Sequence, residues 1–118
     1  MKKILITLVL IMAFVSTYGQ NKYHERQNKV YIEAAAAEYS LDDKQQAELS
    51  EARMEMVAVY VSSNKAFKND EISKEKKQEL TREASKLYHN KMSKITGKSY
   101  KDMKPFLEKM REELKKVK

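Results

Sequence analysis

Residues 41–67 read LDDKQQAELSEARMEMVAVYVSSNKAF, a stretch that contains neither glycine nor proline. Asp42 is a favourable N-cap, because its carboxylate can accept hydrogen bonds from the free amides of a first helical turn. Gln45 stands three residues later, where its side chain can reach back to the amide of residue 42, and Leu41 supplies an apolar residue just before the cap. Leu41, Asp42 and Gln45 therefore predict that a helix begins at residue 43.

The predicted helix runs from residue 43 to about residue 68. One of its faces carries Leu49, Ala52, Met56, Val59, Tyr60, Ser63 and Phe67, and a second face carries Met54, Val57 and Val61. A helix that is apolar nearly all round is buried on more than one side. Alternating valines over residues 53–61 also allow a strand, but no second segment of the chain suits a pairing partner.

After residue 20 only Gly97 and Pro105 act as helix breakers, so the rest of the chain is expected to be helical as well. Three shorter helices are predicted around the long one. The first spans residues 25–39, and the next spans residues 74–95 and ends near Gly97. Proline fits only the first turn of a helix, so the last helix is expected to begin near residues 102–104, or after a short turn from Ser99. The apolar stripes assigned to these helices are Tyr23, Val30, Ala34, Ala37 and Leu41; then Leu80, Ala84, Leu87, Tyr88, Met92 and Ile95; then Met103, Phe106, Leu107, Met110, Leu114 and Val117. The predicted fold class is all-α, with about four antiparallel helices.

Residues 1–19 have the anatomy of a secretory signal peptide: two lysines, an apolar run over residues 4–15, and small residues before a cleavage site after Gly19. A membrane span is the alternative, but the run is shorter than the roughly 20 residues that a span requires. The mature domain is therefore expected to be residues 20–118, exported to the periplasm. Its 22 basic and 17 acidic side chains give a net charge of +5. The two signs are interspersed, which argues against a nucleic-acid partner.

No catalytic constellation or cofactor motif is present, so the sequence argues against an enzyme and predicts no cofactor. His24 and His89 lack the converging ligands that a zinc site needs, and each is interpreted as a surface residue. Met54 and Met56 could hold Cu(I) together only on a strand, because residues two apart on a helix point about 200° apart. No metal ligand is therefore predicted.

The order of features resembles the Spy/CpxP family of small periplasmic proteins, whose mark is a repeated Leu-Thr-x-x-Gln motif. Leu41, Asp42 and Gln45 stand at the first motif, with Asp in place of Thr. A second copy would fall at residues 95–99, where only Thr96 matches. The resemblance covers most of residues 39–110. It implies a thin, curved helical cradle, usually dimeric, that acts as an ATP-independent chaperone for unfolded envelope proteins or in envelope stress signalling.

On this reading the concave face of the cradle would bind unfolded clients, and the protein would form a homodimer through the long helix. The apolar candidates for the client surface are Met54, Val57, Val61, Phe67 and Met92, and its basic rim is Arg53, Lys65 and Lys68. The methionines are interpreted first as core residues, and the alternative is an adaptable binding surface, because thioether side chains repack easily. The alternative function is an envelope regulatory or metal-responsive protein that contacts a sensor.

Overall fold

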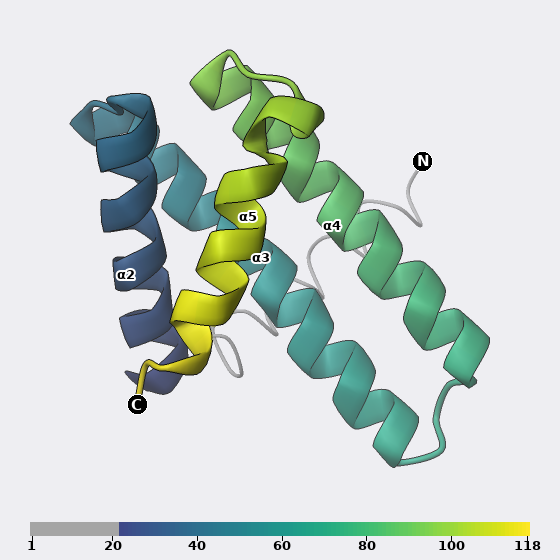
Figure 1. Ribbon diagram of the computed structural model, residues 1–118. Coiled ribbons are helices and arrows are strands. Elements are labelled where there is room, and N and C mark those ends of the chain that lie inside the picture. The colour runs from purple at the N-terminus through teal and green to yellow at the C-terminus, as the bar shows by residue number, and fades with distance from the viewer. Residues whose placement is uncertain (1–21) are drawn as a thin grey trace.

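A computed structural model describes residues 22–118, which form four helices and no strand (Figure 1). Their bounds are α2 Lys22–Tyr39, α3 Asp43–Lys68, α4 Lys74–Thr96 and α5 Tyr100–Lys115. The all-α prediction is confirmed, and the strand alternative for residues 53–61 is wrong, since these residues lie within α3. The predicted signal peptide and its cleavage site lie outside the described residues.

Side-chain caps set the helix starts. Asp42 and Gln45 form both halves of a capping box at the start of α3, as predicted. Ser73 accepts a hydrogen bond from the amide of Lys76 at the start of α4. Gly97 ends α4 at φ 72°, a left-handed conformation that costs glycine little. Helix α2 begins three residues before the predicted position 25.

The prediction for Pro105 is wrong. Ser99 accepts from the amide of Asp102 and is the N-cap of α5, so the helix begins at Tyr100 and Pro105 lies beyond its first turn. A proline there removes one backbone hydrogen bond, that to the carbonyl of Lys101. Pro105 is exposed, so water can reach this part of the helix.

Helices α3 and α4 form a long antiparallel hairpin whose loop is residues 69–73. Figure 1 shows α2 and α5 lying together over the half of the hairpin that is remote from this loop. Contacts agree with the picture: Asn28 of α2 hydrogen-bonds to Ser50 of α3, and the ring of Tyr31 meets that of Phe106 of α5 edge-on. One half of the hairpin therefore belongs to a four-helix assembly, and the other half has two helices.

Apart from Val57, Ala58 and Ala84, the buried apolar residues form one cluster in the half of the hairpin that α2 and α5 cover. This core cluster consists of Tyr31, Ile32, Ala35, Leu41, Leu49, Ala52, Tyr88, Met92, Met103, Phe106 and Met110. No residue between 57 and 87 belongs to this cluster or packs against it as a partly buried neighbour. We call residues 57–87 the hairpin end and the remainder of residues 22–118 the four-helix end.

Two of the predicted buried faces need correction. Helix α2 buries Asn28, Tyr31, Ile32 and Ala35, not the stripe through Tyr23 and Val30. Leu87, assigned to the buried face of α4, is 62% exposed. The stripe of α5 is confirmed at Met103, Phe106 and Met110.

Candidate functional site

The three motif residues join the start of α3 to the end of α4. Leu41 is buried in the core, and Asp42 caps α3. Gln45 does more than complete the capping box, because its Nε2 also donates to the backbone carbonyl of Ile95, at 3.1 Å. Ile95 is the first residue of the predicted second motif, so the two motif positions meet at this junction.

Arg53, predicted to lie on the rim of a client surface, is instead buried between α2 and α3. Only 7% of this residue is exposed. Its Nη1 donates to Oδ1 of Asn28 at 3.2 Å, and its guanidinium lies 4.7 Å from the ring centroid of Tyr31. Asn28 in turn donates to Oγ of Ser50 at 2.7 Å. Burial lowers the pKa of Arg53 below its ordinary value, while the nearby tyrosines act in the opposite direction.

Two tyrosine hydroxyls continue this polar network into the core. Tyr88 donates to Oη of Tyr31 at 2.6 Å, and Tyr31 donates to the sulfur of Met92 at 3.5 Å. Burial raises the pKa of Tyr31 to about 12, partly opposed by the hydrogen bond from Tyr88 and by the charge of Arg53. Burial also raises the pKa of Tyr88. Both rings are neutral at physiological pH and act as hydrogen-bonding groups of the core.

The structure divides the predicted client-binding residues into three groups. Arg53, Val57 and Met92 are buried and contribute no surface in this conformation. Met54, Val61 and Phe67 are partly buried, and Lys65 and Lys68 are exposed. Met92 is fully covered because α5 packs over the second half of α4. The accessible members therefore lie on α3, mostly toward the hairpin end.

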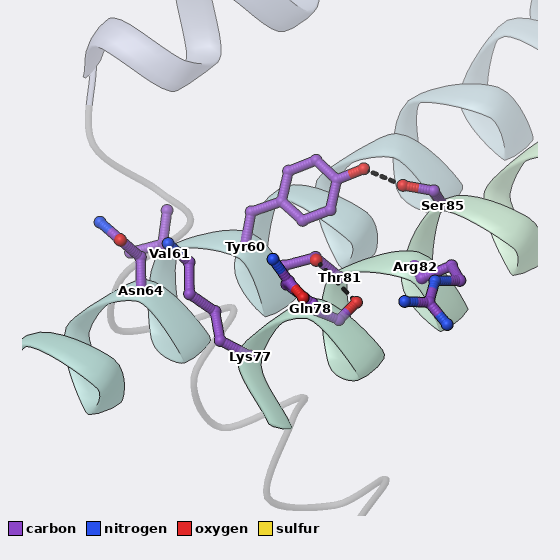
Figure 2. Close-up of a pocket in the computed structure, with 8 residues that line it drawn as sticks. All are labelled: Tyr60, Val61, Asn64, Lys77, Gln78, Thr81, Arg82 and Ser85. Atoms are coloured by element: carbon purple, nitrogen blue, oxygen red, sulfur yellow. Dashed lines mark hydrogen bonds between the residues drawn. The ribbon is translucent and has the colours of Figure 1, made fainter. Parts of the chain in front are cut away.

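A groove of about 880 Å³ lies between α3 and α4 in the hairpin end (Figure 2). Its lining residues are Tyr60, Val61, Asn64, Lys77, Gln78, Thr81, Arg82 and Ser85. The hydroxyl groups of Tyr60 and Ser85 hydrogen-bond to each other across the two helices. Lys77 extends along the groove, with its Nζ 4.9 Å from the ring centroid of Phe67. Two cations and several neutral polar groups thus face one open concavity.

Sequence reasoning missed most of this groove. Four of its residues, Gln78, Thr81, Arg82 and Ser85, recur every three or four positions and so share one face of α4. That spacing was available in the sequence. A polar stripe on a helix ordinarily indicates a solvated face, and only the pairing of α3 with α4 makes it the wall of a groove.

The structure bears on the copper site that Met54 and Met56 could have formed on a strand. Met54 and Met56 both lie on α3, so they point in different directions and lack the strand that a shared copper site required. Over residues 22–118, no three His, Cys, Asp or Glu side chains come together in a way that could hold a metal ion. His89 packs between the rings of Tyr88 and Tyr100.

No protein-family model, curated protein or solved structure matches this chain. The resemblance to the Spy/CpxP family therefore rests on the motif residues and the order of the helices. None of the helices in residues 22–118 is both long and apolar enough to cross a membrane.

Proposed function

We propose that the protein is an ATP-independent, holdase-like chaperone of the Spy/CpxP type that binds unfolded chains in the periplasm. The observation that carries this proposal is the division of the hairpin. In the hairpin end, two helices without a second layer leave Val61, Phe67 and Leu87 accessible and contribute nothing to the core cluster, whereas the four-helix end combines that core with a few exposed apolar side chains such as Val30. Accessible apolar groups on a stable scaffold can cover the apolar segments of an unfolded client.

The proposed client surface combines apolar and basic side chains. Met54, Val61 and Phe67 are partly accessible, and Leu87 is the most exposed large hydrophobic residue of the described chain. Lys65 and Lys68 lie at the loop end of α3 and would attract acidic segments of a client. This surface excludes Arg53, Val57 and Met92, which are buried.

Dimerisation and a cradle shape belong to the same proposal. A second copy packed along α3 would add the missing layer at the hairpin end and would cover part of its apolar surface. Sedimentation equilibrium of residues 20–118 tests this directly. A monomer at every concentration would contradict the dimer without affecting the proposed client binding.

The experiment for the function is suppression of aggregation of a chemically reduced, unfolded client, without ATP. The purified mature chain at several-fold molar excess is expected to keep the client soluble. Leu87→Lys should raise the concentration needed for half-maximal protection about fivefold, because one leucine contact of about 1 kcal/mol is lost. Val30→Lys is the matched control, since Val30 is also exposed but lies on α2 in the four-helix end.

The outcome separates the proposal from its competitors. Full client aggregation with the wild-type chain would reject a holdase. Equal losses in Leu87→Lys and Val30→Lys would show that binding is not located at the hairpin end. Circular dichroism of both variants checks that each retains the helical content of the wild type.

A further inference from the structure

The groove between α3 and α4 differs in charge from the other concavities of the described chain. Its lining includes Lys77 and Arg82 and no carboxylate. The hollow between α2 and α3 has two glutamates and one lysine, and the hollow between Glu48 and Lys94 has three glutamates and two lysines. Compared with these two hollows, the groove therefore favours an anion electrostatically.

The two cations of the groove have not been neutralised by the protein. Neither Lys77 nor Arg82 forms an ion pair with a carboxylate of residues 22–118. By contrast, Lys76 on the next face of α4 pairs with Glu79. Figure 2 shows both side chains at the groove, on either side of Gln78 and Thr81. An arriving anion would therefore not compete with an internal carboxylate for either of them, although the Nζ of Lys77 lies over the ring of Phe67.

The neutral groups of the groove narrow the class of ligand. Asn64 and Gln78 each present a donor and an acceptor, and Tyr60 adds an aromatic ring. The hydroxyl of Thr81 donates to the carbonyl of Gln78 and that of Ser85 bonds to Tyr60, so these two offer a ligand mainly their remaining lone pairs. Val61 is the single aliphatic side chain among the lining residues. A peptide would rely on pockets for apolar side chains, whereas a sugar offers many hydroxyl groups and a ring face that packs on tyrosine.

The length of the groove favours an extended ligand. The groove is shallow and widely open to solvent, so a ligand would lie along it rather than be enclosed. Its wall on α4 extends from Lys77 to Ser85, about 12 Å at 1.5 Å per residue. That length accommodates more than one sugar ring, with an acidic group near each cation.

We propose that this groove binds a short acidic oligosaccharide, a chain of sugar rings that carry carboxylates. Arg82 binds one carboxylate through its planar guanidinium, which matches carboxylate geometry, and Lys77 binds the next as a point charge. The amides and hydroxyls of the groove bind the ring hydroxyls. The groove adjoins the proposed client surface, because Val61 belongs to both and Lys77 lies over Phe67, but Leu87 is not among its lining residues.

The test uses the folded mature chain and a tetrasaccharide of galacturonic acid as the probe. Titration followed by backbone-amide NMR should move the resonances of Asn64, Gln78 and Thr81, and isothermal titration calorimetry gives the Kd. Arg82→Gln should weaken binding about tenfold, since one charge-assisted pair is lost. Lys86→Gln is the control, because Lys86 is an exposed cation of α4 outside the groove lining, and its Kd should equal that of the wild type.

Further results decide the proposal. A neutral tetrasaccharide of galactose should bind more weakly at the same residues, and raised salt should weaken the acidic probe. Binding of tetraglutamate as tight as the acidic sugar, at the same amides, would overturn the choice of a sugar. Shifts outside the groove, or equal effects of Arg82→Gln and Lys86→Gln, would overturn the site. The two proposals fail separately, because the effect of Leu87→Lys on client aggregation tests the holdase function and the Kd of Arg82→Gln for the acidic sugar tests the groove.

Discussion

The two ends of the molecule are built from the same pair of helices, yet they bury different kinds of residue. In the four-helix end, α2 and α5 add a second layer, and Leu49 and Met92 are 0% exposed. In the hairpin end, the buried residues of α3 and α4 include the small side chains of Ser63 and Ala84. Small residues allow two helices to approach closely but bury little apolar area. A second layer, rather than sequence hydrophobicity alone, decides where the stability of this chain resides.

The largest expected effect compares one leucine from each end. Leu49→Ala should lower the free energy of unfolding by about 2–5 kcal/mol, because it leaves a cavity in a core that cannot readily collapse. Leu80→Ala makes the same chemical change in the hairpin end, where the side chain is only partly buried. It should cost less than about 1.5 kcal/mol, since less apolar surface returns to water. Urea unfolding followed by circular dichroism measures both variants.

Equal losses of unfolding free energy for the two leucine variants would contradict this difference between the two ends, because they would show that the hairpin end contributes as much apolar stabilisation as the core. The comparison requires a single cooperative transition, which coincident circular dichroism and tyrosine fluorescence curves would establish. A separate, earlier unfolding transition reported only by residues 57–87 would show directly that the hairpin end is the less stable of the two ends.

A smaller loss of stability is expected at alkaline pH, because of the buried tyrosines of the four-helix end. The folded-state pKa of Tyr31, about 12, is higher than its ordinary value of 10.0. The folded protein therefore binds this proton more tightly than the unfolded chain. Stability is retained below pH 10 and is lost as pH rises from about 10 to 12. The loss is roughly 2–3 kcal/mol for a shift of this size.

Unfolding by urea at pH 8, 10 and 11 checks this dependence. Tyr31→Phe should flatten the alkaline fall, even though it removes hydrogen bonds and lowers stability at pH 8. Tyr23→Phe is the control, because Tyr23 is 40% exposed and its ring is not in the core cluster. An identical alkaline fall in wild type and Tyr31→Phe would show that Tyr31 does not contribute to it, and would leave the buried hydroxyl of Tyr88 as the group to test next.

Much of the fold follows from local chemistry that the sequence displays. Two predictions that depend only on residues a few positions apart are confirmed: the start of α3 at residue 43 and the end of α4 near Gly97. The resemblance to the Spy/CpxP family and the spacing of the apolar residues also predicted four helices. The start of α5 was misplaced because Pro105 was expected to mark a first turn, whereas the cap at Ser99 determined it.

The buried face of α2 depends on contacts distant in sequence, and there the prediction was wrong. Hydrophobicity favoured Tyr23 and Val30, but α2 instead places Asn28 against Ser50 and Arg53. A polar face becomes buried only because the partner helix supplies matching groups, and one sequence does not reveal that match. Arg53 was assigned to a rim for the same reason. The groove of the hairpin end likewise requires knowledge of how α3 and α4 pair.

The smallest effect compares the caps at opposite ends of the hairpin. Asp42→Ala removes the cap of α3 in the four-helix end and should lower the free energy of unfolding by about 1–2 kcal/mol. The loss arises because the backbone amide of Gln45 no longer has the carboxylate of Asp42 as its acceptor, while the amide of residue 42 can still donate to Oε1 of Gln45. Ser73→Ala removes the cap of α4 beside the exposed loop, where water can replace the hydroxyl, and should cost about 0.5–1 kcal/mol.

Thermal unfolding of the two cap variants, with Ser62→Ala as a reference away from any helix end, measures the difference. Ser62 donates only to the carbonyl of Val59 within α3, so its removal should leave the melting temperature nearly unchanged. A larger loss in Ser73→Ala than in Asp42→Ala would mean that the hairpin end governs cooperative unfolding. The reverse order would place that role at the junction of Gln45 and Ile95, where the start of α3 is held to the end of α4.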